Sequence, residues 1–203
     1  MTPEAFIGKA IIEMVNDNVS VHFNRRKYNS RYSYNFFTSG DNGAHKKPEK
    51  AELVINYFCE DFSHWFPVFV HEYCHYLEWK DDPEYDILIS RGCEKFGKFL
   101  NGDIKTINKS SIRQIQQMEI DCDARAIKLI NKHKFPIDLE KYIKEENLYI
   151  YCYGYMAKYK KFFIPFEAEL LDMMPSELID VEYCNTPNKE LEQLYLKHLY
   201  PPK

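Results

Sequence analysis

Residues 71 to 75, with the sequence HEYCH, combine the side-chain types and the spacing that suit a zinc ion. Residues four apart lie on one face of a helix, so the imidazoles of His71 and His75 can converge on one ion at ~2.0 to 2.1 Å. Glu72 is turned about 100° from His71 around the helix axis, so its carboxylate can lie beside the ion without binding it. There it can hold a zinc-bound water and accept its proton. We therefore predict one Zn²⁺ bound by His71 and His75, with Glu72 as the general base.

The surroundings of this motif favour a metal site over a chance match, which the short H-E-x-x-H pattern alone would allow. The segment from Val68 to Trp79 contains no glycine or proline and is predicted to be a helix, and a predicted strand precedes it. Phe69, Val70 and Leu77 make this helix apolar. The motif therefore lies where a buried active-site helix is expected.

A catalytic zinc site needs a third protein ligand, with one position left for water. Glu78 is near in sequence, but on a continuous helix it lies about 10 Å along the axis from His71, so we expect a solvated or outer carboxylate. Glu119 and Asp123 lie four apart on another predicted helix, from about 112 to 133, and so share a face. Glu119 is the predicted third ligand. Asp123 is expected to accept a hydrogen bond from the free ring N–H of His71.

Other residues could fill the remaining roles. Glu167 and Glu169, at the start of a later acidic helix, are alternatives to Glu119 as the third ligand. Most glutamates are solvated charges on a helix face, and this purely structural interpretation is open for Glu119, Glu167 and Glu169 alike. An oxyanion donor would be a Tyr, His or Arg, and the candidates are Tyr151, Tyr153, Tyr155 and His133. Because the chain has sixteen tyrosines, none of them is assigned.

H-E-x-x-H followed on a later helix by E-x-x-x-D, here Glu119 to Asp123, resembles the gluzincin metallopeptidases, and the acidic helix is similar to that of the small ImmA/IrrE-like members. The resemblance covers residues 1–133. It implies that the glutamate of the motif is the general base and the later one the third ligand. It also implies a short sheet whose edge strand, Leu53 to Phe58, binds an extended peptide by strand addition. Cys74 departs from the small members, which have glycine or another small residue there.

The pattern of elements predicts a predominantly helical α+β fold: a zincin-like domain with a short N-terminal sheet of about three strands on the active-site helix, then further helices. Alternation from Val19 to Phe37 predicts two strands in a hairpin, and a polar loop from 38 to 49 precedes the third strand. The other predicted helices are 3–16, 83–100, 139–159, 167–173 and 189–199, with caps at Thr2, Asp82 and Ser110 or Ser111, and at Ser63 for the motif helix. We expect residues 1–133 to form the core and 134–203 a helical extension packed on it, in a single compact domain.

Composition excludes several classes of function. The formal net charge of −4 gives no electrostatic drive for nucleic-acid binding. No run approaches the ~18 to 20 apolar residues of a membrane span, and the N-terminus lacks a signal-peptide pattern, so we expect a cytoplasmic protein. The six cysteines form no Cys-x-x-Cys pair, which favours reduced thiols over disulfides or a cysteine-rich zinc site.

These observations predict a zinc-dependent metallopeptidase that hydrolyses peptide bonds of a protein or peptide substrate through a zinc-activated water. One alternative is a catalytically idle protein that keeps the gluzincin scaffold to recognise a protein partner. Another is a hydrolase of some non-peptide bond, because the same metal-bound water serves other substrates.

Overall fold

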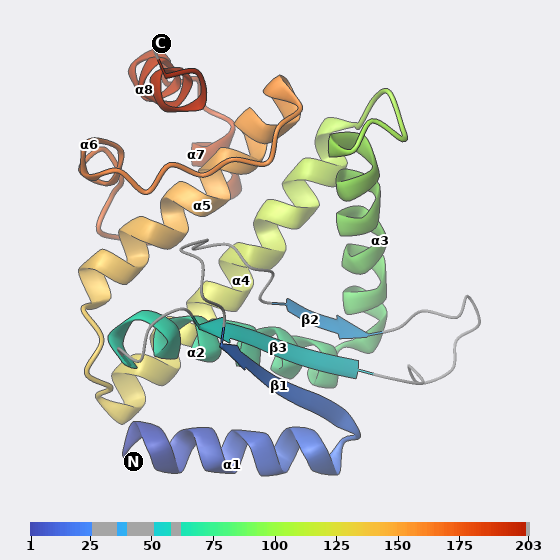
Figure 1. The fold of residues 1–203 in the computed structure, drawn as a ribbon, viewed down its shortest axis with the longest axis vertical. Helices are drawn as coiled ribbons and strands as arrows, with labels where there is room; N and C mark the ends of the chain where they lie inside the picture. Colours follow the sequence, from blue (N-terminus) through green and yellow to red (C-terminus); the bar gives the residue numbers. More distant parts are fainter. Residues whose placement is uncertain (26–35, 40–50, 58–61, 202–203) are drawn as a thin grey trace. The chain divides into compact units, whose positions relative to one another are not determined.

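The computed structural model describes residues 1–25, 36–39, 51–57 and 62–201, and they form the predominantly helical α+β fold that the sequence predicts (Figure 1). The strands in this part of the chain are β1 (Val19–Arg25), β2 (Phe36–Ser39) and β3 (Ala51–Tyr57). The helices are α1 (Pro3–Asn16), α2 (Phe62–Asp81), α3 (Pro83–Leu100), α4 (Lys109–His133), α5 (Leu139–Tyr159), α6 (Ala168–Leu171), α7 (Val181–Cys184) and α8 (Lys189–Leu199). Most of the predicted second strand, most of the loop from 38 to 49, and Phe58 lie outside the described residues.

The chain divides into two compact units, each with its own core. The first contains Met1–Ser90 and Arg125–Ile137, and the second contains Arg91–Ala124 and Asp138–Lys203. The divisions fall inside α3 and α4, so each of these helices contributes residues to both units. The sheet and the HEYCH motif belong to the first unit, whereas Glu119 and Asp123 belong to the second.

The sheet has the strand order β1-β3-β2, which corrects two predictions. β1 runs parallel to β3, with Val21 opposite Leu53, and β2 runs antiparallel to β3, with Phe37 also opposite Leu53. β1 and β2 therefore do not form a hairpin, and β3, which contains Leu53 to Tyr57 of the predicted edge strand, lies between the other two strands of the described sheet. Leu53, Val54 and Ile55 are all buried, so β3 is covered on both faces. A strand of this kind gains most at the centre of a sheet, and alternation in the sequence identifies strands but not their neighbours.

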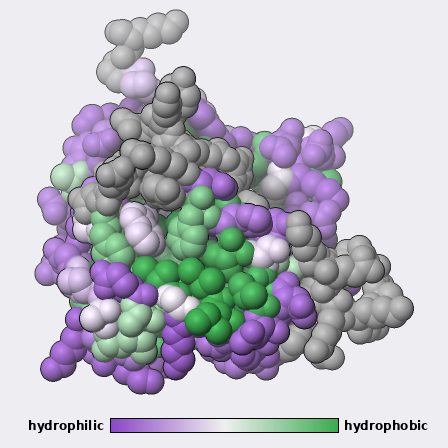
Figure 2. All heavy atoms as spheres, turned by 60° about the horizontal axis from the view of Figure 1, so that its bottom comes forward, coloured by the Kyte–Doolittle hydropathy of each residue, from purple (hydrophilic) through white to green (hydrophobic). Residues whose placement is uncertain are grey.

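Helix α1 begins and ends where the sequence predicts. The Thr2 hydroxyl accepts a hydrogen bond from the backbone N–H of Ala5 at 3.3 Å, and proline occupies the first helical position, where its missing N–H costs no helical bond. Phe6, Ala10 and Met14 form the buried face. Other apolar residues face outward: Ile12 of α1 is 65% exposed. Figure 2, which brings the α1 side of Figure 1 forward, shows apolar residues gathered among hydrophilic ones.

Helix α2 carries the motif and packs against β3 and β2. Its N-terminus differs from the prediction, because Ser63 is its second residue and not its cap. Pro67 lies inside the helix, where it lacks the N–H that would bond to the carbonyl of Ser63. The lost bond is accompanied by aromatic packing: Phe66 is 1% exposed, and the ring of Phe6 meets that of Tyr73 edge-on at 5.4 Å.

Polar contacts also join α1 to the last turns of α2. The Glu13 carboxylate accepts hydrogen bonds from the Tyr73 hydroxyl at 2.8 Å and from the Lys80 ammonium at 2.9 Å. The Tyr76 hydroxyl donates to Asp17 at 2.6 Å. Burial and these carboxylates raise the pKa of Tyr76 to about 12. The two helices are thus held in register by both ring packing and charge-assisted bonds.

In the second unit, α5 and α8 have the predicted bounds because their caps are local signals. Asp138 accepts from the N–H of Lys141 at 3.1 Å, and Asn188 accepts from that of Leu191 at 3.0 Å. Helix α4 begins earlier than predicted, because Asn108, not Ser110 or Ser111, accepts the N–H of Ser111 at 2.8 Å. None of the helices in the described ranges is long and apolar enough to cross a membrane.

Candidate metal centre

His71, Glu72 and His75 lie in the middle of α2, on turns that follow Pro67 and contain no further helix breaker. His71 is 8% exposed and Glu72 is 7% exposed. Their neighbours Val70 and Cys74 are completely buried, which explains why this part of α2 stays out of water. Burying imidazole and carboxylate groups is costly unless they have polar or charged partners, so these side chains are candidates for a functional role.

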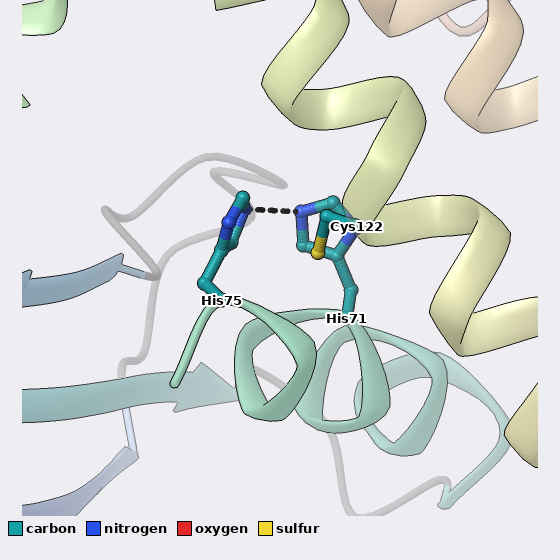
Figure 3. A group of neighbouring side chains, drawn as sticks. All are labelled: His71, His75 and Cys122. Atoms are coloured by element: carbon teal, nitrogen blue, oxygen red, sulfur yellow. Dashed lines mark hydrogen bonds between the residues drawn. The ribbon is translucent and has the colours of Figure 1, made fainter. Parts of the chain in front are cut away.

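The two histidine rings turn toward each other (Figure 3). Their Nε2 atoms are 3.1 Å apart, and the ring planes meet at 84°. Two nitrogens bound at ~2.0 to 2.1 Å to one tetrahedral ion are about 3.3 to 3.4 Å apart, close to the observed separation. His71 and His75 could therefore hold a metal ion through Nε2 with only a small adjustment of their side chains.

Of the two roles expected for Glu78, a solvated or an outer carboxylate, its position favours the second. Its Oε2 lies 3.6 Å from Nδ1 of His75, and its side chain is only 9% exposed. It is thus a buried carboxylate beside the nitrogen that His75 would not use for metal binding, and it is not solvated. The spacing of three residues from His75 to Glu78 was the signal for this pair. The distance along the helix axis argues only against direct binding of Glu78 to the ion that His71 would bind.

Two more buried carboxylates lie one turn apart on α4 in the second unit. Glu119 is 5% exposed and Asp123 is completely buried. Each accepts a hydrogen bond from a tyrosine of α5: Tyr153 donates to Oε1 of Glu119 at 2.8 Å, and Tyr142 donates to Oδ1 of Asp123 at 2.6 Å. Burial, followed by the neighbouring carboxylates, raises the pKa of both tyrosines well above the ordinary value, so both hydroxyls remain donors.

Comparison with protein-family models, with curated proteins and with solved structures gave no match. The chain's own residues are therefore the basis for its function. The first unit brings His71, His75 and Glu78 together, with Glu72 adjacent to His71 in sequence. The second unit places Glu119 and Asp123 against the tyrosines of α5.

The alternative ligands Glu167 and Glu169 are both exposed. Glu169 accepts hydrogen bonds from Lys197 at 2.9 Å and pairs with Nε2 of His198 at 2.6 Å. These contacts, with that of Lys197 the stronger, lower the pKa of the Glu169 carboxyl. Exposed ion pairs of this kind are common on protein surfaces. The buried position of Glu119 distinguishes it from both alternatives.

The other tyrosine candidates for an oxyanion donor have structural partners. Tyr151 donates to the carbonyl of Thr186 at 2.8 Å, and Tyr155 donates to that of Asn188 at 3.1 Å. These bonds hold the segment before α8 against α5. His133 lies in the first unit, where its ring stacks on that of Phe135. Burial, followed by nearby positive charges, lowers its pKa.

Proposed function

We propose that the protein is a zinc-dependent metallopeptidase. The observation that carries this proposal is the 3.1 Å separation of the Nε2 atoms of His71 and His75, with the buried Glu72 next to His71 on the same helix. This donor set suits zinc, which prefers nitrogen and carboxylate ligands in a tetrahedral arrangement. The histidine spacing is also the one by which a helix presents two imidazoles and an adjacent general base.

In the proposed site, His71, His75 and Glu119 are the three protein ligands. A bound zinc would lower the pKa of its water to ~7 and polarise the scissile carbonyl. Glu72 would hold this water by a hydrogen bond, accept its proton and deliver it to the departing amine. Asp123 would accept a hydrogen bond from His71, and Glu78 would do so from Nδ1 of His75, fixing which nitrogen of each ring faces the ion.

Burial supports Glu119 as the third ligand. A carboxylate that is removed from water needs compensation by a cation or by several donors, and a second carboxylate one turn away increases this need. Asp123 lies at that position, on the same face of α4. A divalent cation would offset the repulsion between the two groups. Glu167 and Glu169 have no such need, because both are solvated.

The proposed substrate is a peptide segment of a protein in an extended conformation. Such a segment can add to the edge of a sheet through main-chain hydrogen bonds. β3 cannot accept it because both of its sides are paired, so strand addition would use β1 or β2, at the two edges of the described sheet. We also propose the cytoplasm as the compartment, because the six cysteines of the sequence form no Cys-x-x-Cys pair and are too sparse for a disulfide scaffold.

Three versions of the protein test the proposal: wild type, Glu72→Gln and His75→Ala. Elemental analysis after purification should give one zinc per chain for wild type and Glu72→Gln, and substantially less for His75→Ala. Mass spectrometry of a peptide library should find cleavage by wild type, abolished by chelator and restored by zinc, and none by Glu72→Gln.

A fully active Glu72→Gln protein would refute the mechanism. Retention of zinc by the His75→Ala variant would refute the site. Wild type that binds zinc stoichiometrically but cleaves nothing in the library would favour the idle scaffold that recognises a protein partner.

A further inference from the structure

Tyr153 is the buried residue of α5 whose hydroxyl contacts the proposed third ligand. Its oxygen lies 2.8 Å from Oε1 of Glu119, and both residues are less than a tenth exposed. Phe96 packs against the Tyr153 ring, with 5.5 Å between ring centroids, and so restricts its movement. The hydrogen bond therefore joins two side chains that have little freedom to rearrange.

The direction of this hydrogen bond follows from a second contact. The hydroxyl of Tyr149, one turn earlier on α5, lies 2.9 Å from that of Tyr153. A phenol has a single proton, so Tyr153 can donate either to Tyr149 or to Glu119. A carboxylate is the stronger acceptor. Tyr153 therefore donates to Glu119, and Tyr149 donates to Tyr153, in a chain of two hydroxyls that ends on Oε1.

A carboxylate can bind zinc through one oxygen or through both. An oxygen that already accepts a charge-assisted hydrogen bond is the poorer ligand, because its lone-pair density is drawn toward the donor. The bond from Tyr153 thus makes the two oxygens of Glu119 inequivalent. Oε1 faces the tyrosine chain, and Oε2 becomes the better metal ligand.

We propose that Tyr153 is a positioning residue that restricts Glu119 to binding the metal through a single oxygen. The inference rests on the proposed function, in which Glu119 is the third ligand. Its chemical importance lies in the coordination number. Two histidines and one carboxylate oxygen leave the fourth tetrahedral position for the attacking water. A carboxylate that bound through both oxygens would compete for that position.

This role differs from the other one considered for Tyr153, that of an oxyanion donor. A hydroxyl committed to Glu119 cannot at the same time donate to a developing oxyanion. The two roles predict different effects of removing the hydroxyl. A positioning residue alters the metal environment before any substrate is present, whereas an oxyanion donor alters turnover and leaves the metal environment unchanged.

The test uses the full chain loaded with Co²⁺, whose visible absorption reports coordination number, and with Zn²⁺ for X-ray absorption spectroscopy. Tyr153→Phe removes the hydroxyl and keeps the ring. Tyr151→Phe is the matched control, since this buried tyrosine of the same helix donates instead to the carbonyl of Thr186. Metal dissociation constants are measured by competition with a chelator, and each metal-free variant is checked by circular dichroism and thermal melting.

We expect Tyr153→Phe to weaken metal binding by about 10- to 100-fold, the usual effect of losing a partner that orients a ligand. We also expect one additional oxygen in the zinc coordination shell and a Co²⁺ spectrum of higher coordination number. Tyr151→Phe should match wild type in both measurements. If Tyr153→Phe fails to fold, Tyr149→Phe replaces it, because it breaks the same chain at its first member and should shift both readouts in the same direction by less.

Every other outcome of the test contradicts one specific claim. A Tyr153→Phe protein with the wild-type dissociation constant and spectrum would refute the positioning role, as would an unchanged Tyr149→Phe protein in its place. If Tyr153→Phe and Tyr151→Phe had equal effects, the Tyr153 hydroxyl would have only a structural role. Failure of wild type to bind either metal would instead refute the proposed function. Unchanged binding by Glu119→Gln would refute Glu119 as a ligand.

Discussion

The hydrogen bond from Tyr142 to Asp123 should be one of the costliest single bonds to remove from the second unit. It is 2.6 Å long, and its two residues are 3% and 0% exposed. Tyr142→Phe keeps the ring but leaves a buried carboxylate oxygen without this donor. Hydrogen bonds to charged groups contribute ~1.5 to 3 kcal/mol, so we expect the free energy of unfolding to fall by that amount. In a chain of this size the melting temperature would fall by about 3 to 12 °C.

A matched variant separates the effect of charge from the loss of a hydroxyl. Tyr155 is also a buried tyrosine of α5, but it donates to the neutral carbonyl of Asn188 at 3.1 Å. Tyr155→Phe should cost only ~0.5 to 1.5 kcal/mol. Both variants are unfolded in urea with a chelator present, so that metal binding makes no contribution to the comparison.

A double-mutant cycle with Asp123→Asn tests the physical cause. If the carboxylate charge makes the bond valuable, Tyr142→Phe should cost much less in the Asp123→Asn background, with a coupling energy of ~0.5 to 3 kcal/mol. The carboxylate charge would not be the cause if Tyr142→Phe cost no more than Tyr155→Phe, or if its cost were the same in both backgrounds.

Three further predictions concern α2 and its contacts. Burial is the largest single effect on the pKa of Glu13 and raises it, but the hydrogen bonds from Lys80 and Tyr73 and the charge of Lys80 together lower the net pKa. Glu13→Gln should therefore destabilise the protein at pH 7 and progressively less below pH ~4, which urea unfolding across pH would measure. Tyr76 has its pKa raised to about 12, so its contribution is complete below pH ~10 and lost as the pH rises, which absorbance at 295 nm during alkaline unfolding should show. Glu78→Gln should weaken zinc binding ~10- to 100-fold through His75, and chelator competition that gave the wild-type affinity would contradict this.

The sequence predicted those elements whose limits are set by local chemistry. Helices α1, α5 and α8 have their expected bounds because a capping side chain lies directly before each of them. Strand pairing depends on residues far apart in the chain, so the alternating pattern identified strands but assigned the wrong neighbours. The short α7 was not predicted, since four residues are too few to show a helical period.

The candidate site likewise contains residues that local spacing predicts and residues that only long-range packing brings together. His71 and His75 could be found from spacing alone, because one helical turn determines their geometry. The tyrosine partners of Glu119 and Asp123 could not, since Tyr153 is separated from Glu119 by more than thirty residues and is one of sixteen tyrosines. Only packing of α5 against α4 distinguishes it from the rest.

The order of strands in the sheet has a consequence for how the histidine pair is assembled. Val19 pairs with Ala51, so β1 and β3 must close a loop of about thirty residues before the sheet exists, and β3 needs partners on both sides. Such non-local pairing is slow, whereas a helical turn forms in about a microsecond or less. His71 and His75 depend only on such a turn. A metal ion bound by both would therefore stabilise α2 in the unfolded chain, and could nucleate this helix before the sheet that it packs against has formed.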